Sequence, residues 1–232
     1  MPVPQKISII IPTLNEEEQI GGLLEQLVAW PGIEIIVSDG GSRDETVKIC
    51  RHYPVQVLNS APGRGVQLNT GAQKASGDIL FFLHADSVIE ERTLTDIRAA
   101  LSRGYQWGCC TLAFNDKSIF FSIIALFSNL RARCLSSCYG DQGIFCQRDL
   151  FFQAGQFPEM VFLEDLEFSR TLRRLKRAHV ITGKVETSAR RFYEGGLLRT
   201  ICKMQVIKIL YRLGVKPERL LQWYGVNPRK VG

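Results

Sequence analysis

Residues 77–90 read GDILFFLHADSVIE, and this stretch decides the fold. An apolar run from Ile79 to Leu83 is followed at once by His84 and Asp86, and then by polar residues. Such a run is typical of a strand buried on both faces, as in the centre of a parallel sheet. Residues two apart on an extended chain share a face, so we expect the imidazole and the carboxylate to point together at the carboxyl end of this strand. A bound metal, a bound ribose or simple contact with water would each explain the pair.

The segments before this strand alternate between short apolar runs and helical patterns. The predicted strands are 6–11, 33–40, 55–60 and 78–86, and the predicted helices are 16–30, 44–53 and 65–76. This alternation over short connections predicts an α/β fold with a mostly parallel central sheet flanked by helices. Three acids, Glu16 to Glu18, are expected in the first turn of the first helix, where the helix dipole favours negative charge.

The pattern changes after about Leu101. Further strands are predicted at 108–115 and 143–147, helices at 118–130, 163–177 and 196–214, and an extended segment at 179–192. The apolar stretch 118–130 is shorter than the roughly 20 residues that span a bilayer. We favour a buried helix for it. An interfacial helix is the alternative, because Lys117, Arg131 and Arg133 flank the stretch as a headgroup region would require.

The chain of 232 residues has a formal net charge of +6 and seven cysteines. Its length favours one α/β domain with appended elements. The positive charge suits an anionic partner such as a nucleotide or a lipid headgroup. With no C-x-x-C pair and no signal-peptide pattern in the sequence, we expect reduced thiols in a cytoplasmic chain, either free or peripheral to the membrane.

Polar residues follow each of the first four predicted strands, at the sheet edge where ligands of parallel α/β sheets bind. The four clusters are Pro12 to Glu16, Asp39 to Asp44, Gly63 to Gly65 and His84 to Asp86. Each cluster alone has an ordinary explanation as a turn, a first helical turn or a solvated loop. Because all four converge on one edge, a shared binding site explains them better.

Three familiar sites are missing from the sequence. It contains no G-x-G-x-x-G for a dinucleotide, no G-x-x-x-x-G-K-[ST] phosphate loop and no G-x-S-x-G nucleophile elbow. A Rossmann dehydrogenase, a P-loop NTPase and an α/β-hydrolase are therefore disfavoured.

Four segments together resemble the family 2 glycosyltransferases of the GT-A fold: ISIIIPTLNEE, IIVSDGGSRDET, GRGVQLNTGAQKASGDILFFLHAD and FLEDLEFSRTLR. The Gly-Arg-Gly and His-Ala-Asp variants, with TSARRF, resemble a bacterial subfamily associated with radical-SAM and selenium-domain genes. Some members of that subfamily are linked to arsenosugar biosynthesis. The resemblance covers about residues 6–192. It implies a single GT-A domain over 1–232, with a nucleotide-binding half at 1–104, an acceptor and catalytic half at 105–195 and a helical tail at 196–232.

The resemblance implies a UDP- or GDP-sugar as donor. The residues that would bind it are Pro12, Thr13 and Glu16 in the nucleotide pocket, Asp39 on the base, Arg64 and Asn69 near the diphosphate, and His84, Ala85 and Asp86. The family's metal motif is Asp-x-Asp, so Asp86 is expected to hold Mn²⁺ or Mg²⁺, with His84 as a tentative second ligand. His84 replaces the first acid, which removes one negative charge and favours Mn²⁺ over Mg²⁺.

The same resemblance assigns the acceptor side. Asp165 would be the general base that takes the proton of the acceptor hydroxyl, with inversion at the anomeric carbon. Glu164, Asp141 and Gln142 would lie near the sugar or the acceptor. Without the resemblance, Glu164 and Asp165 would pass for an ordinary acidic helix start. Arg190 and Arg191 would either close over the diphosphate or belong to a basic surface strand.

The leading hypothesis is an inverting, metal-assisted glycosyltransferase acting on a hydroxyl acceptor, either a small molecule or a lipid-linked one. A sugar-nucleotide nucleotidyltransferase is an alternative. Such an enzyme should have a loop rich in Gly and Arg or Lys after its first strand, and this chain has no such loop there. A catalytically silent nucleotide-binding protein is the second alternative, and His84 favours it. No nucleic-acid partner is expected. The basic residues of the predicted helix 196–214 form no single stripe. We therefore leave open whether this helix packs on the edge of the domain or forms a homodimer contact.

Overall fold

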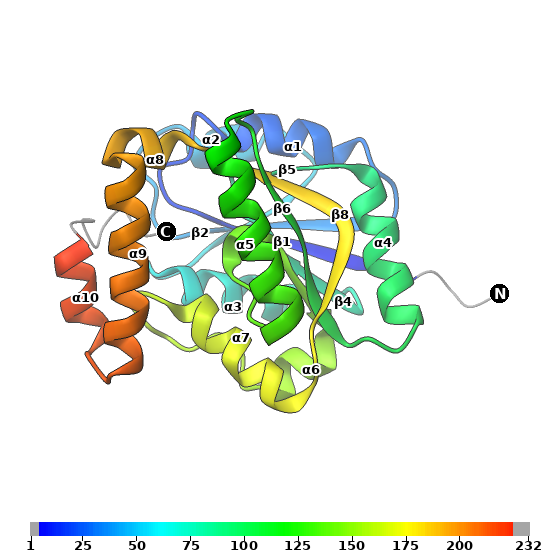
Figure 1. Ribbon diagram of the computed structural model, residues 1–232. Helices are drawn as coiled ribbons and strands as arrows, with labels where there is room; N and C mark the ends of the chain where they lie inside the picture. Colours follow the sequence, from blue (N-terminus) through cyan, green and yellow to red (C-terminus); the bar gives the residue numbers. More distant parts are fainter. Residues whose placement is uncertain (1–4, 225–232) are drawn as a thin grey trace.

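The computed structural model describes residues 5–224, apart from the side chains of Arg190, Arg191, Glu194, Leu198 and Tyr224. Within this range eight strands form one sheet in the order β3-β2-β1-β4-β7-β6-β8-β5 (Figure 1). The strands are β1 (Ile7–Thr13), β2 (Ile33–Asp39), β3 (Gln56–Asn59), β4 (Ile79–Phe82), β5 (Val88–Ile89), β6 (Trp107–Phe114), β7 (Ile144–Gln147) and β8 (His179–Thr187).

The sheet is mostly parallel, as the sequence predicts. Strands β3, β2, β1 and β4 pair in parallel, and β8 pairs in parallel with β6. Strand β7 is antiparallel to both of its neighbours, β4 and β6, and β5 is antiparallel to β8. All strands except β7 and β5 therefore point the same way, and the carboxyl ends of β1, β2, β3 and β4 share one edge.

Helices cover both faces of this sheet (Figure 1). The described helices are α1 (Ile20–Val28), α2 (Thr46–Cys50), α3 (Arg64–Lys74), α4 (Glu91–Ser102), α5 (Ile119–Leu135), the 3₁₀ turn η1 (Gly140–Gln142), α6 (Arg148–Gln153), α7 (Glu164–Leu175), α8 (Arg190–Gly195), α9 (Leu197–Arg212) and α10 (Pro217–Tyr224).

Two hydrophobic cores form because successive strand residues point to opposite faces of the sheet. Ile9 and Phe81 belong to one core, together with side chains of α1, α2 and α4. Ile10 and Phe82 belong to the other, together with side chains of α3, α6 and α7. The central strands are thus buried on both faces, which explains their uninterrupted apolar runs.

Several predicted boundaries are wrong. Helix α1 begins at Ile20, so Glu16 to Glu18 lie in the turn before it. Strand β4 ends at Phe82, which leaves His84 and Asp86 in the following turn. Strand β8 ends at Thr187, and the segment predicted to be extended up to 192 continues into helix α8. Helix α4 lies where no element is predicted, although Leu94, Ile97 and Leu101 have helical spacing.

The prediction that the apolar segment 118–130 is a buried helix is also wrong. It forms α5, but only Phe121, Ala125, Asn129 and Ala132 are buried along that helix. Its other side carries large apolar side chains in contact with solvent, among them Phe127, which is 66% exposed. No helix among the described residues has the length and apolar character needed to cross a bilayer.

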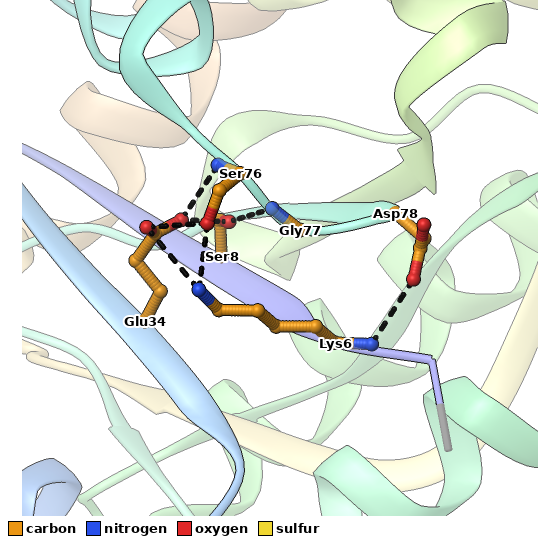
Figure 2. Close-up of polar contacts among 6 residues, drawn as sticks. All are labelled: Lys6, Ser8, Glu34, Ser76, Gly77 and Asp78. Carbon is orange, nitrogen blue, oxygen red and sulfur yellow. Dashed lines mark hydrogen bonds and ion pairs between the residues drawn. The ribbon is translucent and has the colours of Figure 1, made fainter. Parts of the chain in front are cut away.

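A polar network ties the amino ends of the central strands together (Figure 2). The Glu34 carboxylate on β2 accepts hydrogen bonds from the Ser8 hydroxyl on β1 and from the backbone and hydroxyl of Ser76, at 2.8 and 2.7 Å. The Lys6 ammonium lies 3.4 Å from the same carboxylate and 2.6 Å from the Ser76 hydroxyl. The Gly77 N–H donates to Ser8 at 2.9 Å, and a Cβ at Gly77 would come within 2.6 Å of that hydroxyl. The network therefore requires glycine at 77 and fixes where β4 starts beside β1.

We predict that Glu34→Gln lowers the free energy of unfolding at pH 7 by roughly 1 kcal/mol, because a partly exposed carboxylate loses charge-assisted hydrogen bonds. Burial opposes the Glu34 charge, but the hydrogen bonds from Ser8 and Ser76 and the charge of Lys6 outweigh it and lower the pKa. This stabilisation is present above the unfolded-state pKa and is lost as the pH falls through the lower folded-state pKa. Urea unfolding should therefore show a difference at pH 7 that shrinks below about pH 4.

Glu25→Gln is the matched control, because Glu25 is an exposed acid on α1. Its unfolding midpoint should equal that of the wild type at both pH values. Equal midpoints for Glu34→Gln and the wild type at pH 7 would contradict the role of the network.

Candidate active site

A cavity of about 290 Å³ opens at the carboxyl edge of the sheet. Eight of the residues predicted for the site line it: Pro12, Glu16, Arg64, His84, Ala85, Asp86, Asp141 and Asp165. The loops after β1 and β4 and the start of α3 form one wall. A second wall comes from η1, the start of α7 and helix α9. The structure thus brings together residues that lie up to about 150 positions apart in the sequence.

Asp165, at the start of α7, is held in place by two backbone N–H donors. Its Oδ2 accepts a hydrogen bond from the Gly140 N–H at 2.8 Å, and its Oδ1 accepts one from the Leu166 N–H at 2.7 Å. A Cβ at Gly140 would lie 2.8 Å from His84 Nε2 and 3.3 Å from Asp165 Oδ2. Only glycine at 140 therefore allows the imidazole and this carboxylate to approach the same backbone segment.

His84 is surrounded by charged groups. Burial and the nearby Arg64 guanidinium lower the pKa of His84, although Asp86, Asp141 and Asp165 act in the opposite direction. The ring is therefore expected to be neutral at physiological pH, when one ring nitrogen can accept a hydrogen bond or bind a metal.

Asp141 has an unusual environment for a carboxylate. Its Oδ1 is buried and has no hydrogen-bond partner in the structure. Burial raises the pKa of Asp141, and the neighbouring Asp165 adds to this effect, while Arg131 and His84 oppose it. An orphaned buried carboxylate oxygen is expected to bind a ligand, a cation or a water molecule.

Arg64 forms a buried ion pair with Glu164. The Arg64 Nε donates to Glu164 Oε1, and the Glu164 side chain is 1% exposed. Burial opposes the charge of Arg64, but the carboxylates of Glu164, Asp165 and Asp141 outweigh it and raise the pKa further. Arg64 remains a cation and lines the cavity, whereas Glu164 lies behind it and does not reach the cavity.

Four other predicted site residues do not line the cavity either. Thr13 donates to Asp39 at 3.1 Å, and Asp39 also accepts hydrogen bonds from the backbone of Gly41 and Ser42 and from the Ser42 hydroxyl. These four bonds fill the accepting capacity of the Asp39 carboxylate. A nucleotide base would therefore have to displace one of them.

Asn69 and Gln142 have structural roles. The Asn69 amide donates to the Phe157 carbonyl at 2.9 Å and accepts from the Phe157 N–H at 3.0 Å, so it links α3 to the segment before α7. Gln142 is fully buried, where its Oε1 accepts from Arg131 and from the backbone of Tyr139. The expectation that Asn69 assists at the diphosphate and that Gln142 contacts the acceptor has no support from their positions.

Helix α9 supplies residues that no sequence motif identifies: Met204, Ile207 and Lys208. The Lys208 ammonium lies 4.4 Å from the centroid of the Tyr139 ring, and the Arg131 guanidinium lies 3.5 Å from it. Burial and the Arg131 charge lower the pKa of Lys208 to about 8. No sequence signal separates Lys208 from Arg199, Lys203 and Arg212, the other basic residues of this helix. The side chains of Arg190 and Arg191 lie outside the described part of the chain.

The residues of the cavity are compatible with a divalent cation, although they form no complete cage. Among the described residues no group of three or more His, Cys, Asp or Glu side chains is arranged to hold a metal. A cation that bridges two phosphates needs only one or two protein carboxylates, because phosphate oxygens and water complete its shell. Asp86 can supply one carboxylate here, and Asp141 lines the same cavity.

Comparison with known proteins matches residues 8–125 to the family described as glycosyl transferase family 2. Among curated relatives, the poly(ribitol-phosphate) beta-N-acetylglucosaminyltransferase TarP of Staphylococcus aureus is 30% identical over 104 residues, which are 40% of this chain and 32% of TarP. The chain therefore matches about a third of the length of this relative.

Two solved structures share the fold. S. aureus TarS 1-349 in complex with UDP-GlcNAc has a TM-score of 0.62 at 22% identity, over 79% of this chain and 58% of that chain. The mannosyltransferase PcManGT from Pyrobaculum calidifontis, in complex with GDP-Man and Mn²⁺, has a TM-score of 0.66 at 17% identity, over 96% of this chain and 68% of that one.

These likenesses confirm the predicted GT-A fold, with its mostly parallel sheet flanked by helices. The family match covers just over half of the chain and includes the cavity residues Pro12, Glu16, Arg64 and His84 to Asp86. This chain belongs to glycosyltransferase family 2.

Proposed function

We propose that this chain transfers a sugar from a nucleoside-diphosphate sugar to a hydroxyl group of an acceptor, with inversion at the anomeric carbon. The observation that carries the proposal is the position of Asp165. Asp165 lines the same cavity as Arg64 and Asp86. A base and a diphosphate-binding wall in one cavity are the arrangement that such a transfer needs.

In this mechanism Pro12, Glu16 and the turn from His84 to Asp86 bind the donor nucleotide, which we infer to be UDP or GDP. TarS and PcManGT, which were solved with UDP-GlcNAc and GDP-Man, support a donor of this class. Arg64 and Lys208 place positive charge where the leaving diphosphate develops its negative charge. In this proposal Asp39 binds the nucleotide base, which must first displace one of the four hydrogen bonds that the Asp39 carboxylate accepts now.

Asp165 would take the proton from the acceptor hydroxyl as that oxygen forms its bond to the anomeric carbon. The bond from this carbon to the diphosphate oxygen breaks on the opposite side, and the nucleoside diphosphate leaves with the bonding electrons. The hydrogen bonds from Gly140 and Leu166 fix the orientation of the carboxylate before the acceptor arrives.

A divalent cation is part of the proposal, and PcManGT, which was solved with Mn²⁺, supports it. Asp86 would hold the ion, with His84 as a tentative second ligand. The ion would supply electrostatic stabilisation of the leaving diphosphate. The assignment to the radical-SAM-associated subfamily, the single-domain organisation and the cytoplasmic location belong to the same proposal.

Asp165→Asn should retain donor binding and lower the rate of sugar transfer by about 100-fold or more, because the base is removed and the shape is kept. Donor binding is measured by calorimetry with UDP and GDP. Turnover is measured as release of nucleoside diphosphate from a panel of sugar nucleotides. A nucleotidyltransferase would instead release pyrophosphate, and a silent binding protein would release neither product.

Asp141→Asn is the matched comparison, since Asp141 lines the same cavity and has a raised pKa. It should reduce turnover much less than Asp165→Asn. If Asp141→Asn abolishes turnover while Asp165→Asn stays active, the base is Asp141 and our assignment is wrong.

Asp86→Ala should lose the increase in UDP or GDP affinity that Mn²⁺ gives to the wild type, because the carboxylate that holds the ion is missing. Calorimetric titration with and without Mn²⁺ measures this difference. Glu90→Ala removes an exposed acid four positions later and should behave like the wild type. The same Mn²⁺ effect in Asp86→Ala and the wild type would contradict this role of Asp86.

Lys208→Met should weaken the binding of UDP or GDP roughly tenfold at pH 7, because a buried cation near the diphosphate is removed. The pKa of Lys208 is lowered to about 8, so the wild type should lose affinity as the pH rises through 8 and the ammonium loses its proton. The variant should lack this part of the pH dependence. Lys203→Met is the control, because Lys203 lies on the same helix and does not line the cavity. Parallel pH profiles for Lys208→Met and the wild type would refute the prediction.

A further inference from the structure

One side of α5 is apolar and exposed to solvent. Six residues form it, and we call them the α5 apolar face: Ile119, Phe120, Ile123, Leu126, Phe127 and Leu130. At 100° per residue these six side chains fall within an arc of about 120°. The most exposed of them are Ile119 at 70% and Phe127 at 66%. Surface apolar residues usually occur singly, so a contiguous stripe of this length indicates a binding surface.

Helix α5 cannot bury this face by rotating about its own axis. Its opposite side, which includes Phe121 and Ala132, is buried, and α5 packs on β6. The Asn129 side chain donates to the Leu112 carbonyl at 3.1 Å and accepts from the Leu112 N–H at 2.9 Å. These bonds fix the rotation of α5 about its axis. Figure 1 shows α5 on the outside of the molecule, in front of β6.

Basic residues flank the α5 apolar face at both ends. Lys117 precedes the helix and is exposed, and Arg131 and Arg133 lie near its C-terminus, where Arg133 is also exposed. The sequence from 117 to 135 contains no Asp or Glu. Tyr193, which is 66% exposed, lies beside the N-terminal end of the helix, where the centroid of its ring is 5.7 Å from that of the Phe121 ring. An apolar stripe with cations and a tyrosine at its margins is typical of helices that lie at a bilayer interface.

From this arrangement we infer that the α5 apolar face docks on the surface of a bilayer that contains anionic lipids. The apolar side chains would enter the boundary between headgroups and acyl chains, and Lys117 and Arg133 would contact the headgroup phosphates. Vesicle binding needs no sugar transfer, so this inference stands or falls separately from the proposed function.

A second copy of the chain would cover this face less well. Two α5 helices packed antiparallel would bring Lys117 of each copy towards Arg131 and Arg133 of the other. A parallel pair would place each cation beside its own counterpart. Residues 116–135 carry one acid, Asp116, and three bases, so either packing leaves a net positive charge. An anionic bilayer supplies the opposite charge at both ends of the helix.

The docked face would lie close to the cavity. The ring of Phe121, on the buried side of α5, lies 5.0 Å from the ring of Phe114 and 5.5 Å from that of Phe192, and both of these residues line the cavity. A bilayer on the outer side of α5 would therefore be separated from the cavity wall by the helix alone. If the proposed sugar transfer is correct, on which this last step rests, this position favours the lipid-linked acceptor over the small molecule.

The inference is tested by flotation of the full chain with two kinds of vesicles. One is pure phosphatidylcholine, and the other contains phosphatidylcholine and phosphatidylglycerol in equal parts. The wild type should float with the anionic vesicles, and added NaCl should weaken this binding. Phe120→Gln/Phe127→Gln should reduce the bound fraction to the background level. Lys117→Gln/Arg133→Gln should weaken binding to anionic vesicles roughly fivefold for each charge removed.

Val88→Gln/Leu213→Gln is the matched control, because these exposed apolar residues lie on β5 and at the C-terminal end of α9, outside the α5 apolar face. It should bind vesicles like the wild type. Thermal unfolding of each variant shows that it is folded, and sedimentation velocity reports its oligomeric state. The inference is overturned if the wild type binds neither kind of vesicle, or if Phe120→Gln/Phe127→Gln binds like the wild type. It is also overturned if the wild type is a dimer that this variant dissociates, since a second copy would then cover the face.

Discussion

The ion pair between Arg64 and Glu164 joins the two walls of the cavity. Arg64 begins α3 on the first wall, and Glu164 begins α7 on the second wall. Two further contacts support the same junction. Asn69 makes two hydrogen bonds to the backbone of Phe157, and a Cβ at Gly65 would come within 2.8 Å of the Pro158 carbonyl oxygen. Because Asp165 follows Glu164 directly, this junction determines where the proposed base lies relative to the diphosphate wall.

This junction also explains why a cluster of opposite charges can persist with little exposure to water. A buried ion pair is costly unless its hydrogen bonds and neighbouring charges compensate for the loss of hydration. Arg64 has three carboxylates around it, and the cavity beside them is polar on the side of Asp86 and Asp141. A nucleoside diphosphate with a divalent cation would bring both signs of charge into this environment. Asp141 Oδ1 has no hydrogen-bond partner here, and burial lowers the pKa of Lys208 to about 8.

The register of β1 with β2 and β4 determines two features of the sheet. One is the polar network at the amino ends of these strands, and the other is the cavity at their carboxyl ends. Glu34, Ser8 and Ser76 align β1, β2 and the start of β4, so the loops that follow these strands meet at the opposite edge of the sheet. On the outer side of the molecule, α5 presents large apolar side chains to solvent while its inner side supports the cavity wall. Binding of the donor and docking on a lipid surface would thus use opposite sides of neighbouring elements.

The sequence by itself determined the alternation of strands and helices, and with it the parallel sheet and the edge that carries the cavity. An apolar run such as Ile79 to Leu83 directly indicates a strand that is buried on both faces, because polar residues are disfavoured in such a strand. His84 and Asp86 were also singled out from the sequence, but as the end of a strand that in the structure stops at Phe82. Only the tertiary structure decided which candidates reach the cavity. Asn69 and Gln142 look like binding residues in the sequence, but backbone groups and buried side chains far along the chain satisfy their amides. Lys208 and the exposed face of α5 depend on which side of a helix packs inward. The sequence does not reveal this side, because α5 is apolar nearly all round and the basic residues of α9 form no single stripe.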